Sequence, residues 1–208
     1  MKKLISLLIF FVGCTNLFGQ IETGDDKPVC SVFDPAMWES AYRAPLRDEL
    51  ISLAGDLKDK SVLDIGAGSG FFTFGFAGKA NRVVATELDN RFLEYIDQKE
   101  QRLGLTNIET RQADNKQSEL NNLENVDVAV MVLVYHFLED PGDFLTKVKS
   151  SMKKGGKIII VNGEGFSPRF ITDYLKTTGF RQVSLKKFTL TGGSCGTETF
   201  NIVSAVNL

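Results

Sequence analysis

The chain has few of the residues that build metal centres, with one histidine and three cysteines among 208 residues. These are too few and too scattered for a zinc-ligand spacing, and we predict no bound metal. A basic excess is also missing, because 24 lysines and arginines stand against 26 acids and the formal net charge is −2. Without a basic footprint we expect no nucleic-acid partner. A phosphate-binding loop of the form G-x-x-x-x-G-K-S/T does not occur either.

No apolar run approaches the roughly 20 residues that a membrane-spanning helix needs. The N-terminal run, Leu4–Val12, follows two lysines and precedes small residues before Cys14 and Gln20. This order is typical of a secretory signal peptide. The four residues that end at Cys14 also resemble a bacterial lipobox, with Phe where Leu is usual. We interpret residues 1–20 as a signal peptide or lipoprotein signal, with an uncleaved anchor as the alternative.

The rest of the chain reads as a linker and one domain. Residues 21–35 are polar and are interpreted as the linker. Residues 36–208 show no internal repeat and have the length of a single domain. Within them, residues 36–60 are expected to form a helical cap, because leucines recur at helical spacing between positions 46 and 57. Pro45 should divide this region into two short helices.

The centre of the domain is Ser61–Phe72, with the sequence S-V-L-D-I-G-A-G-S-G-F-F. A short apolar run predicts a buried strand, and three glycines with G-x-G-x-G spacing then lead into a helix-compatible segment. Strand, glycine turn and helix open a nucleotide-binding α/β unit. Asp64 precedes the glycines, and Glu87 ends a second apolar run, Arg82–Thr86.

This combination, VLDIGAGSG followed by VVATELD, resembles the cofactor site of class I S-adenosylmethionine-dependent methyltransferases. The resemblance implies a Rossmann-like doubly wound α/β sheet, mostly parallel, with a C-terminal antiparallel hairpin. It also implies S-adenosylmethionine as the cofactor. The cofactor-binding residues that it implies are Asp64, Gly66, Ala67, Gly68, Gly70, Glu87, Leu88, Asp114 and Met131.

The resemblance assigns a part of the cofactor to each region. The glycine turn would hold the methionine part, and Asp64 would approach its amino group or order the loop. Glu87 would accept the ribose hydroxyls, with Leu88 beside the adenine. Asp114 would accept from the adenine amino group, although an Asp at this position can instead cap the next helix. The backbone near Met131 would complete the methionine end.

Alternating strands and helices are expected after the glycine turn, and two strands end the chain. The expected strands are Asn107–Gln112, Asn125–Val134, Lys157–Asn162 after a turn at Gly155-Gly156, Arg181–Leu190 and Thr197–Val206, and the expected helices are Asn90–Leu103, Gly142–Met152 and Ser167–Thr178.

The acceptor side should follow the most hydrophobic strand. Tyr135 and His136 stand there in a pattern that resembles small-molecule methyltransferases and lacks the N-P-P-Y of nucleic-acid amine methylation. Tyr42, Tyr135 and His136 are the candidate catalytic residues, with Glu164 as a further polar candidate. His136 can equally be a packed, hydrogen-bonded histidine.

The resemblance implies methyl transfer to a small or unidentified acceptor. The alternative is an exported, non-catalytic ligand-binding protein on the same scaffold, because S-adenosylmethionine is made inside cells. A nicotinamide-dependent oxidoreductase is disfavoured by the glycine spacing.

The targeting segment predicts export. The mature protein should begin at Cys14 or near Gln20, and lie in the periplasm or on a membrane facing away from the cytoplasm. N-terminal sequencing of protein from fractionated cells measures this directly. An intact Met1 in the soluble cytosolic fraction would contradict it.

Overall fold

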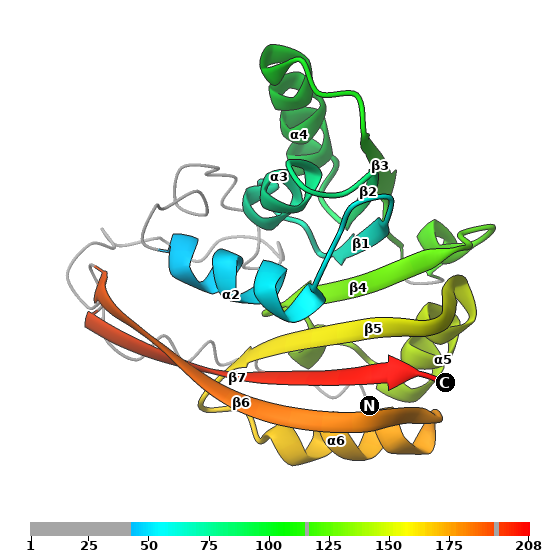
Figure 1. Ribbon diagram of the computed structural model, residues 1–208, viewed down its shortest axis with the longest axis vertical. Helices are drawn as coiled ribbons and strands as arrows, with labels where there is room; N and C mark the ends of the chain where they lie inside the picture. Colours follow the sequence, from blue (N-terminus) through cyan, green and yellow to red (C-terminus); the bar gives the residue numbers. More distant parts are fainter. Residues whose placement is uncertain (1–42, 115–116, 194–195) are drawn as a thin grey trace, which may run out of the picture.

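The computed structural model describes residues 43–114, 117–193 and 196–208, and its elements are arranged as in Figure 1. The predicted signal, the linker, Tyr42 and the start of the cap lie outside the described residues and remain predictions. The helices are α2 (Ala44–Ala54), α3 (Phe71–Ala77), α4 (Asn90–Leu103), α5 (Pro141–Ser151) and α6 (Pro168–Thr177), with 3₁₀ turns η3 (Ser118–Leu120) and η4 (Tyr135–Phe137). The strands are β1 (Ser61–Ile65), β2 (Arg82–Glu87), β3 (Ile108–Gln112), β4 (Val126–Val132), β5 (Met152–Gly163), β6 (Phe180–Gly193) and β7 (Gly196–Asn207).

The described strands form one seven-stranded sheet in the order β3-β2-β1-β4-β5-β7-β6. Strands β1 to β5 pair in parallel, whereas β7 lies antiparallel between β5 and β6. The order reverses between β1 and β4, which is where doubly wound folds bind ligands. The predicted fold class, including the C-terminal antiparallel hairpin, is confirmed.

Helices cover both faces of the sheet, so its central strands are apolar on both sides. Val62 packs in a cluster with α2 and α3, while its neighbour Leu63 packs in a second cluster with α5 and α6. Both side chains are fully buried. Successive strand residues point to opposite faces, so a continuous apolar run suits a sheet buried on both sides. In Figure 1, α2, α3 and α4 accordingly lie apart from α5 and α6.

The start of β5 is the boundary that differs most from the sequence expectation. Strand β5 begins at Met152 rather than Lys157, because Met152 already pairs with Val126 before an irregularity brings Lys157 opposite Val128. The predicted turn at Gly155-Gly156 lies within this irregularity. Pro45 stands in the first turn of α2, where its missing N–H has no helical partner to lose, so within the described residues the proline begins a helix.

Asp127 joins the starts of three neighbouring strands. Its carboxylate accepts from Ser61 N at 2.9 Å and from the ammonium groups of Lys153 at 2.9 Å and Lys60 at 3.4 Å. Burial favours a higher pKa for Asp127, but the hydrogen bonds from Ser61 and Lys153 and the two positive charges hold that pKa below its usual range. The carboxylate is therefore charged at neutral pH and ties β1, β4 and β5 together. None of the helices in the described part of the chain combines the length and apolarity needed to cross a membrane.

Replacing Asp127 by alanine should lower the free energy of unfolding by about 1–3 kcal/mol, because the Ser61 N–H and two ammonium groups lose a charged acceptor. Urea unfolding at neutral pH measures the change. Glu124→Ala, at an exposed position three residues earlier, is the matched control and should stay within about 0.5 kcal/mol of the wild type. Equal effects for the two variants would contradict the anchoring role.

Candidate functional site

The glycine loop leaves the carboxyl end of β1 and is fastened to the neighbouring strand. Gly66 N and Ala67 N both donate to the carbonyl oxygen of Thr86, at 2.8 and 2.9 Å. The Thr86 side chain is buried at the end of β2. Because β1 and β2 are parallel, their carboxyl ends meet at one edge of the sheet, and these two bonds place the loop there.

Glycine is favoured at two positions of the loop, Gly66 and Gly68, for different structural reasons. A Cβ on Gly66 would overlap with Cγ2 of Val134, so Val134, two residues after the end of β4, packs directly against this backbone. Gly68 has a φ of +53°, a region that favours glycine, and a Cβ there would meet nothing within 4 Å. The loop is therefore tightly packed at Gly66 and open at Gly68, where a ligand can approach the backbone.

Glu87 is joined to that open part of the loop. Its Oε2 accepts from Gly68 N at 2.9 Å, and its Oε1 accepts from Leu88 N at 2.7 Å and Asp89 N at 3.2 Å. Three backbone N–H groups thus orient the carboxylate, and Oε2, which accepts only one of them, has capacity for a further donor. Leu88 is 62 % exposed, although a large apolar side chain normally seeks burial. An acid and an exposed apolar side chain beside the loop are the arrangement predicted for ribose and adenine.

Asp64 lies beneath the loop, 2 % exposed, and accepts from Thr73 Oγ1 of α3 at 2.6 Å. Burial raises the pKa of Asp64 to about 6, the Thr73 hydrogen bond opposes this rise, and the negative charge of Glu87 adds to it. Of the two roles that the resemblance suggested, ordering of the loop has a contact in the structure, because Asp64 connects β1 to the helix that follows the loop.

Asp114 follows β3 and makes the contacts of a helix cap, the alternative to its implied role in binding adenine. Its Oδ1 accepts from Ser118 N at 3.0 Å and its Oδ2 accepts from the Ser118 hydroxyl, so it caps the turn that enters η3. Sequence reasoning missed the neighbouring Glu119, which is buried and whose Oε2 accepts from Asp114 N at 3.4 Å. Burial raises the pKa of Glu119. An acid in a polar stretch reads as solvent-exposed, so no sequence signal marked it.

The carboxyl end of β4 completes the edge. Met131 is fully buried and pairs with Ile65, so its backbone runs beside the end of β1. Leu133 then has a φ of +58°, an uncommon conformation for a residue with a side chain, and donates its N–H to Val161 O at 2.8 Å. The chain turns sharply here and brings Val134 against Gly66.

The predicted catalytic residues that the structure describes, Tyr135 and His136, have different surroundings. Tyr135 packs in the core, and its hydroxyl is buried without a hydrogen-bond partner among the described residues. Burial raises the pKa of Tyr135, with a further contribution from Tyr174. A phenol in this position is a poor base. Glu164 is ion-paired with Lys187 at 2.9 Å, and Tyr42 lies outside the described residues.

His136 stays at the edge, in contact with residues that sequence reasoning missed. Its Nδ1 is 3.5 Å from Asn162 Oδ1, and its ring stacks on Phe166 with centroids 4.5 Å apart. Burial lowers the pKa of His136, while the hydrogen bond with Asn162 opposes this fall. The imidazole is therefore neutral at physiological pH. A polar residue at the end of an apolar strand, as in K-I-I-I-V-N, is the signal that could have found Asn162.

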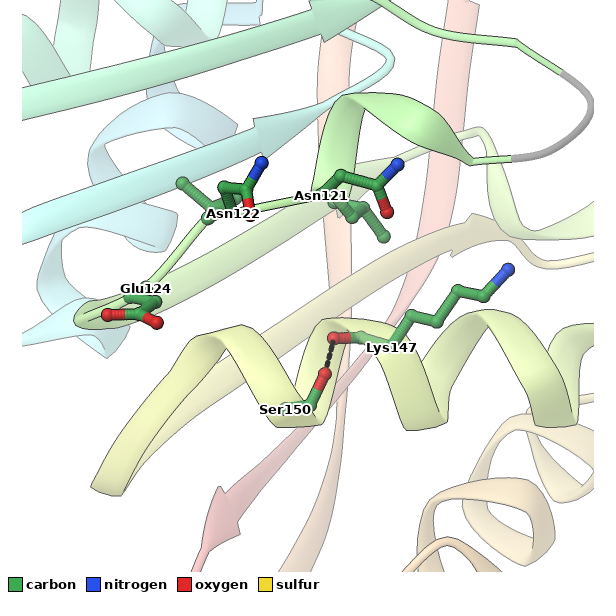
Figure 2. A pocket seen from close by; sticks show the side chains of 7 residues that line it. Asn121, Asn122, Glu124, Lys147 and Ser150 are labelled. Carbon is green, nitrogen blue, oxygen red and sulfur yellow. Dashed lines mark hydrogen bonds between the residues drawn. The ribbon is translucent and has the colours of Figure 1, made fainter.

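A surface pocket of about 320 Å³ lies elsewhere and is drawn in Figure 2. Asn122 and Glu124, which precede β4, form one side of it, and Lys147 and Ser150 of α5 form the other. The pocket thus lies near the amino end of β4, whereas the glycine loop lies at the carboxyl end of the parallel strand β1. It is not part of the candidate site.

The residues at the carboxyl edge fit S-adenosylmethionine. Gly68 leaves the space of a side chain free beside its N–H group. Ser69 in the same loop has a buried hydroxyl without a partner in the described part of the chain, which a bound ligand can satisfy. Glu87 adds a carboxylate for the ribose hydroxyls. Cofactor binding would then fall to the loop Gly66–Gly70, with Glu87 and Leu88 on its β2 side.

The fold and this edge define a Rossmann-like α/β protein in which a glycine loop meets an acid at the end of the next strand. Residues 63–160 match the family model described as a methyltransferase domain. In fold, and in sequence over this segment, the chain is similar to class I S-adenosylmethionine-dependent methyltransferases, the family that the sequence motifs resemble. A comparison with curated proteins gave no match.

Three solved structures illustrate the likeness in fold. A SAM-dependent methyltransferase from Aquifex aeolicus has a TM-score of 0.66 at 21 % identity, over 84 % of this chain and 99 % of that one. A precorrin 8w decarboxylase from Methanobacterium thermoautotrophicum has a TM-score of 0.64 at 23 % identity, over 77 % of this chain and 89 % of that one. Phosphoethanolamine N-methyltransferase 2 from Haemonchus contortus, in complex with S-adenosyl-L-methionine, has a TM-score of 0.64 at 14 % identity, over 78 % of this chain and 52 % of that one.

The raised pKa of Asp64 predicts a pH-dependent cost to folding. Between pH 4 and 6 the unfolded chain releases the Asp64 proton while the folded chain retains it, so stability falls as pH rises and stays lower above pH 6. Asp64→Asn removes this titration and keeps an acceptor for Thr73. From pH 4 to 7 the variant should therefore gain about 2.4 kcal/mol relative to the wild type, at about 1.4 kcal/mol per pKa unit and with the unfolded chain already partly ionised at pH 4.

Urea unfolding at pH 4, 5, 6 and 7 measures this difference. Asp173→Asn, at an exposed position of α6, is the control for removing one carboxyl group. A stability difference between Asp64→Asn and the wild type that does not change with pH would show that Asp64 is not held protonated by burial.

Proposed function

We propose that this protein transfers the methyl group of S-adenosylmethionine to a small acceptor at the carboxyl edge of β1, β2 and β4. The observation that carries the proposal is the joined loop and acid, in which Gly68 N donates to Glu87 at 2.9 Å beside space left by the missing side chain. When bound, S-adenosylmethionine would supply a methyl group activated by its sulfonium sulfur, which is left as a neutral thioether.

The residues have separate tasks in this proposal. The loop backbone and Glu87 bind and orient the cofactor, since positioning is the main contribution that a protein makes to a direct displacement. Asp64 and Thr73 keep the loop attached to α3. His136, neutral and at the same edge, is the candidate base for the acceptor proton. Tyr135 supports the edge by packing in the core, and its buried hydroxyl gives it no such role.

We also propose that the domain works outside the cytoplasm, attached to a membrane through its N-terminus or released from it. This rests on the signal-like residues 1–20 alone. No structural observation favours the alternative of a non-catalytic binding protein, and the assay below separates the two.

Calorimetry with S-adenosylmethionine and with NAD, followed by transfer of a labelled methyl group to a metabolite pool, tests the proposal. We expect binding of S-adenosylmethionine, no binding of NAD, and a labelled small molecule. Binding without transfer to any pool component would favour the non-catalytic alternative, and preference for NAD would refute the cofactor assignment in this chain.

Gly68→Ala should weaken S-adenosylmethionine binding at least tenfold, because a Cβ would enter the open space beside the loop N–H groups. Calorimetry measures the dissociation constant. Gly104→Ala is a matched control, because Gly104 also has a positive φ (+66°) and no neighbour near its Cβ, but it caps the far end of α4. It should bear a similar strain and bind normally. Similar losses of affinity in the two variants would trace the effect to stability.

A further inference from the structure

His136 is surrounded by one buried amide and two aromatic rings. Its Nδ1 is 3.5 Å from Asn162 Oδ1, and the centroids of Phe137 and Phe166 lie 4.0 and 4.5 Å from that of the imidazole. The Phe166 ring is nearly parallel to the imidazole and stacked on it, at an interplanar angle of 20°. Among the described residues, Asn162 is the hydrogen-bond partner that the structure gives to the imidazole, so Asn162 sets how the ring is turned.

Asn162 is itself held in place. It is 1 % exposed in the apolar part of β5 and lies opposite Asn201 of β7, which is 2 % exposed. Asn201 Nδ2 donates to Phe166 O at 3.3 Å, so the same strand pair also positions the stacking ring. A buried carboxamide is costly unless its hydrogen bonds are made. The position of Asn162 between the sheet and His136, the one histidine of the sequence, therefore favours a hydrogen bond to that histidine.

We propose that Asn162 is a positioning residue that accepts from His136 Nδ1–H and so leaves Nε2 as the base for an uncharged, flat acceptor lying on Phe137 and Phe166. This inference rests on the proposed function and adds to it the tautomer, the residue that selects it and the class of acceptor.

The tautomer follows from donor and acceptor chemistry. In a neutral imidazole one nitrogen donates and the other accepts, whereas the oxygen of a carboxamide only accepts. Nδ1 must then carry the proton, because otherwise two lone pairs would face each other. The contact of 3.5 Å is at the long end of the hydrogen-bond range, and catalytic contacts in ligand-free sites commonly shorten when reactants bind. A carboxamide turned by 180° would demand the opposite tautomer, so the tautomer is the decisive observable.

The acceptor class follows from what surrounds the base. Phe137 and Phe166 are 52 % and 46 % exposed, so both rings keep free surface beside His136. Glu164 and Lys187 are paired with each other at 2.9 Å, which leaves neither charge to bind a charged group. Exposed aromatic faces favour flat, apolar partners. Phenols combine such a ring with a weakly acidic hydroxyl.

In the proposed step the acceptor hydroxyl gives its proton to Nε2 of His136. The freed oxygen lone pair forms the bond to the methyl carbon, and the carbon–sulfur bond breaks with its electron pair on sulfur. The imidazolium then releases its proton to water. The step needs no other reactant.

Long-range ¹⁵N–¹H correlation NMR reads the tautomer directly, because the chain contains one histidine. The full chain is purified without a polyhistidine tag and measured at pH 8. We expect a protonated Nδ1 and an unprotonated Nε2 in the wild type and in Asn162→Asp, which keeps an acceptor. Asn162→Ala should lose this preference. Asn207→Ala, which removes another buried amide on the neighbouring β7, should retain it.

A wild-type protein with the proton on Nε2 overturns the inference, as does the same tautomer change in the Asn162→Ala and Asn207→Ala variants. The readout uses protein without cofactor. It therefore stands apart from the proposed function, which fails only if S-adenosylmethionine does not bind or no methyl group is transferred.

The acceptor class is tested with p-cresol as the flat probe and phosphoethanolamine as the charged one, in the presence of S-adenosylmethionine. We expect p-cresol to shift the His136 ring resonances and phosphoethanolamine to leave them in place. Phe166→Leu should weaken the p-cresol response about 2- to 10-fold, the range for loss of an aromatic contact. Phe170→Leu, a more exposed phenylalanine on α6, is the control and should not. A response to phosphoethanolamine alone, or equal losses in both variants, overturns the assignment.

Discussion

The hydrogen bond from Gly68 N to Glu87 holds together the part of the molecule on which the rest of the site depends. It connects a loop that follows β1 to an acid that ends β2, at a distance that only parallel pairing of these strands in register provides. The Thr86 carbonyl, which accepts from Gly66 and Ala67, fastens the same loop a second time. A loop with its amides already oriented loses less conformational entropy when it binds a ligand.

Two acids lie at this edge of the sheet, Glu87 partly exposed and Asp64 buried. Glu87 is solvated in part and oriented by backbone N–H groups, whereas Asp64 beneath it is buried and has its pKa raised to about 6. The two carboxylates therefore differ in burial and in hydrogen-bond partners. The buried acid can then serve as a structural connection to Thr73 while the outer one remains available to a ligand.

The residues proposed for the acceptor side come from the opposite half of the sheet. Strand β5 carries Asn162 to the edge, the antiparallel partner β7 brings Asn201 beside it, and η4 presents His136 toward both phenylalanines. The antiparallel hairpin is thus more than an addition that closes the sheet, because Asn201 reaches the residue that stacks on the histidine. Cofactor and acceptor functions consequently come from different strands that share one edge.

The sequence by itself determined the secondary elements and the place of the glycine loop beside Glu87, because these depend on local patterns. Strand β1, the glycine turn, α3 and α4 follow from apolar runs and glycines, which are neighbours in the chain. Glu87 could be placed because parallel strands bring their ends together in a known order. The tertiary structure decided what depends on packing between distant segments. It buried the Tyr135 side chain in the core and brought Asn162 and Phe166 to His136, since contacts between residues far apart in the chain leave no local pattern in the sequence.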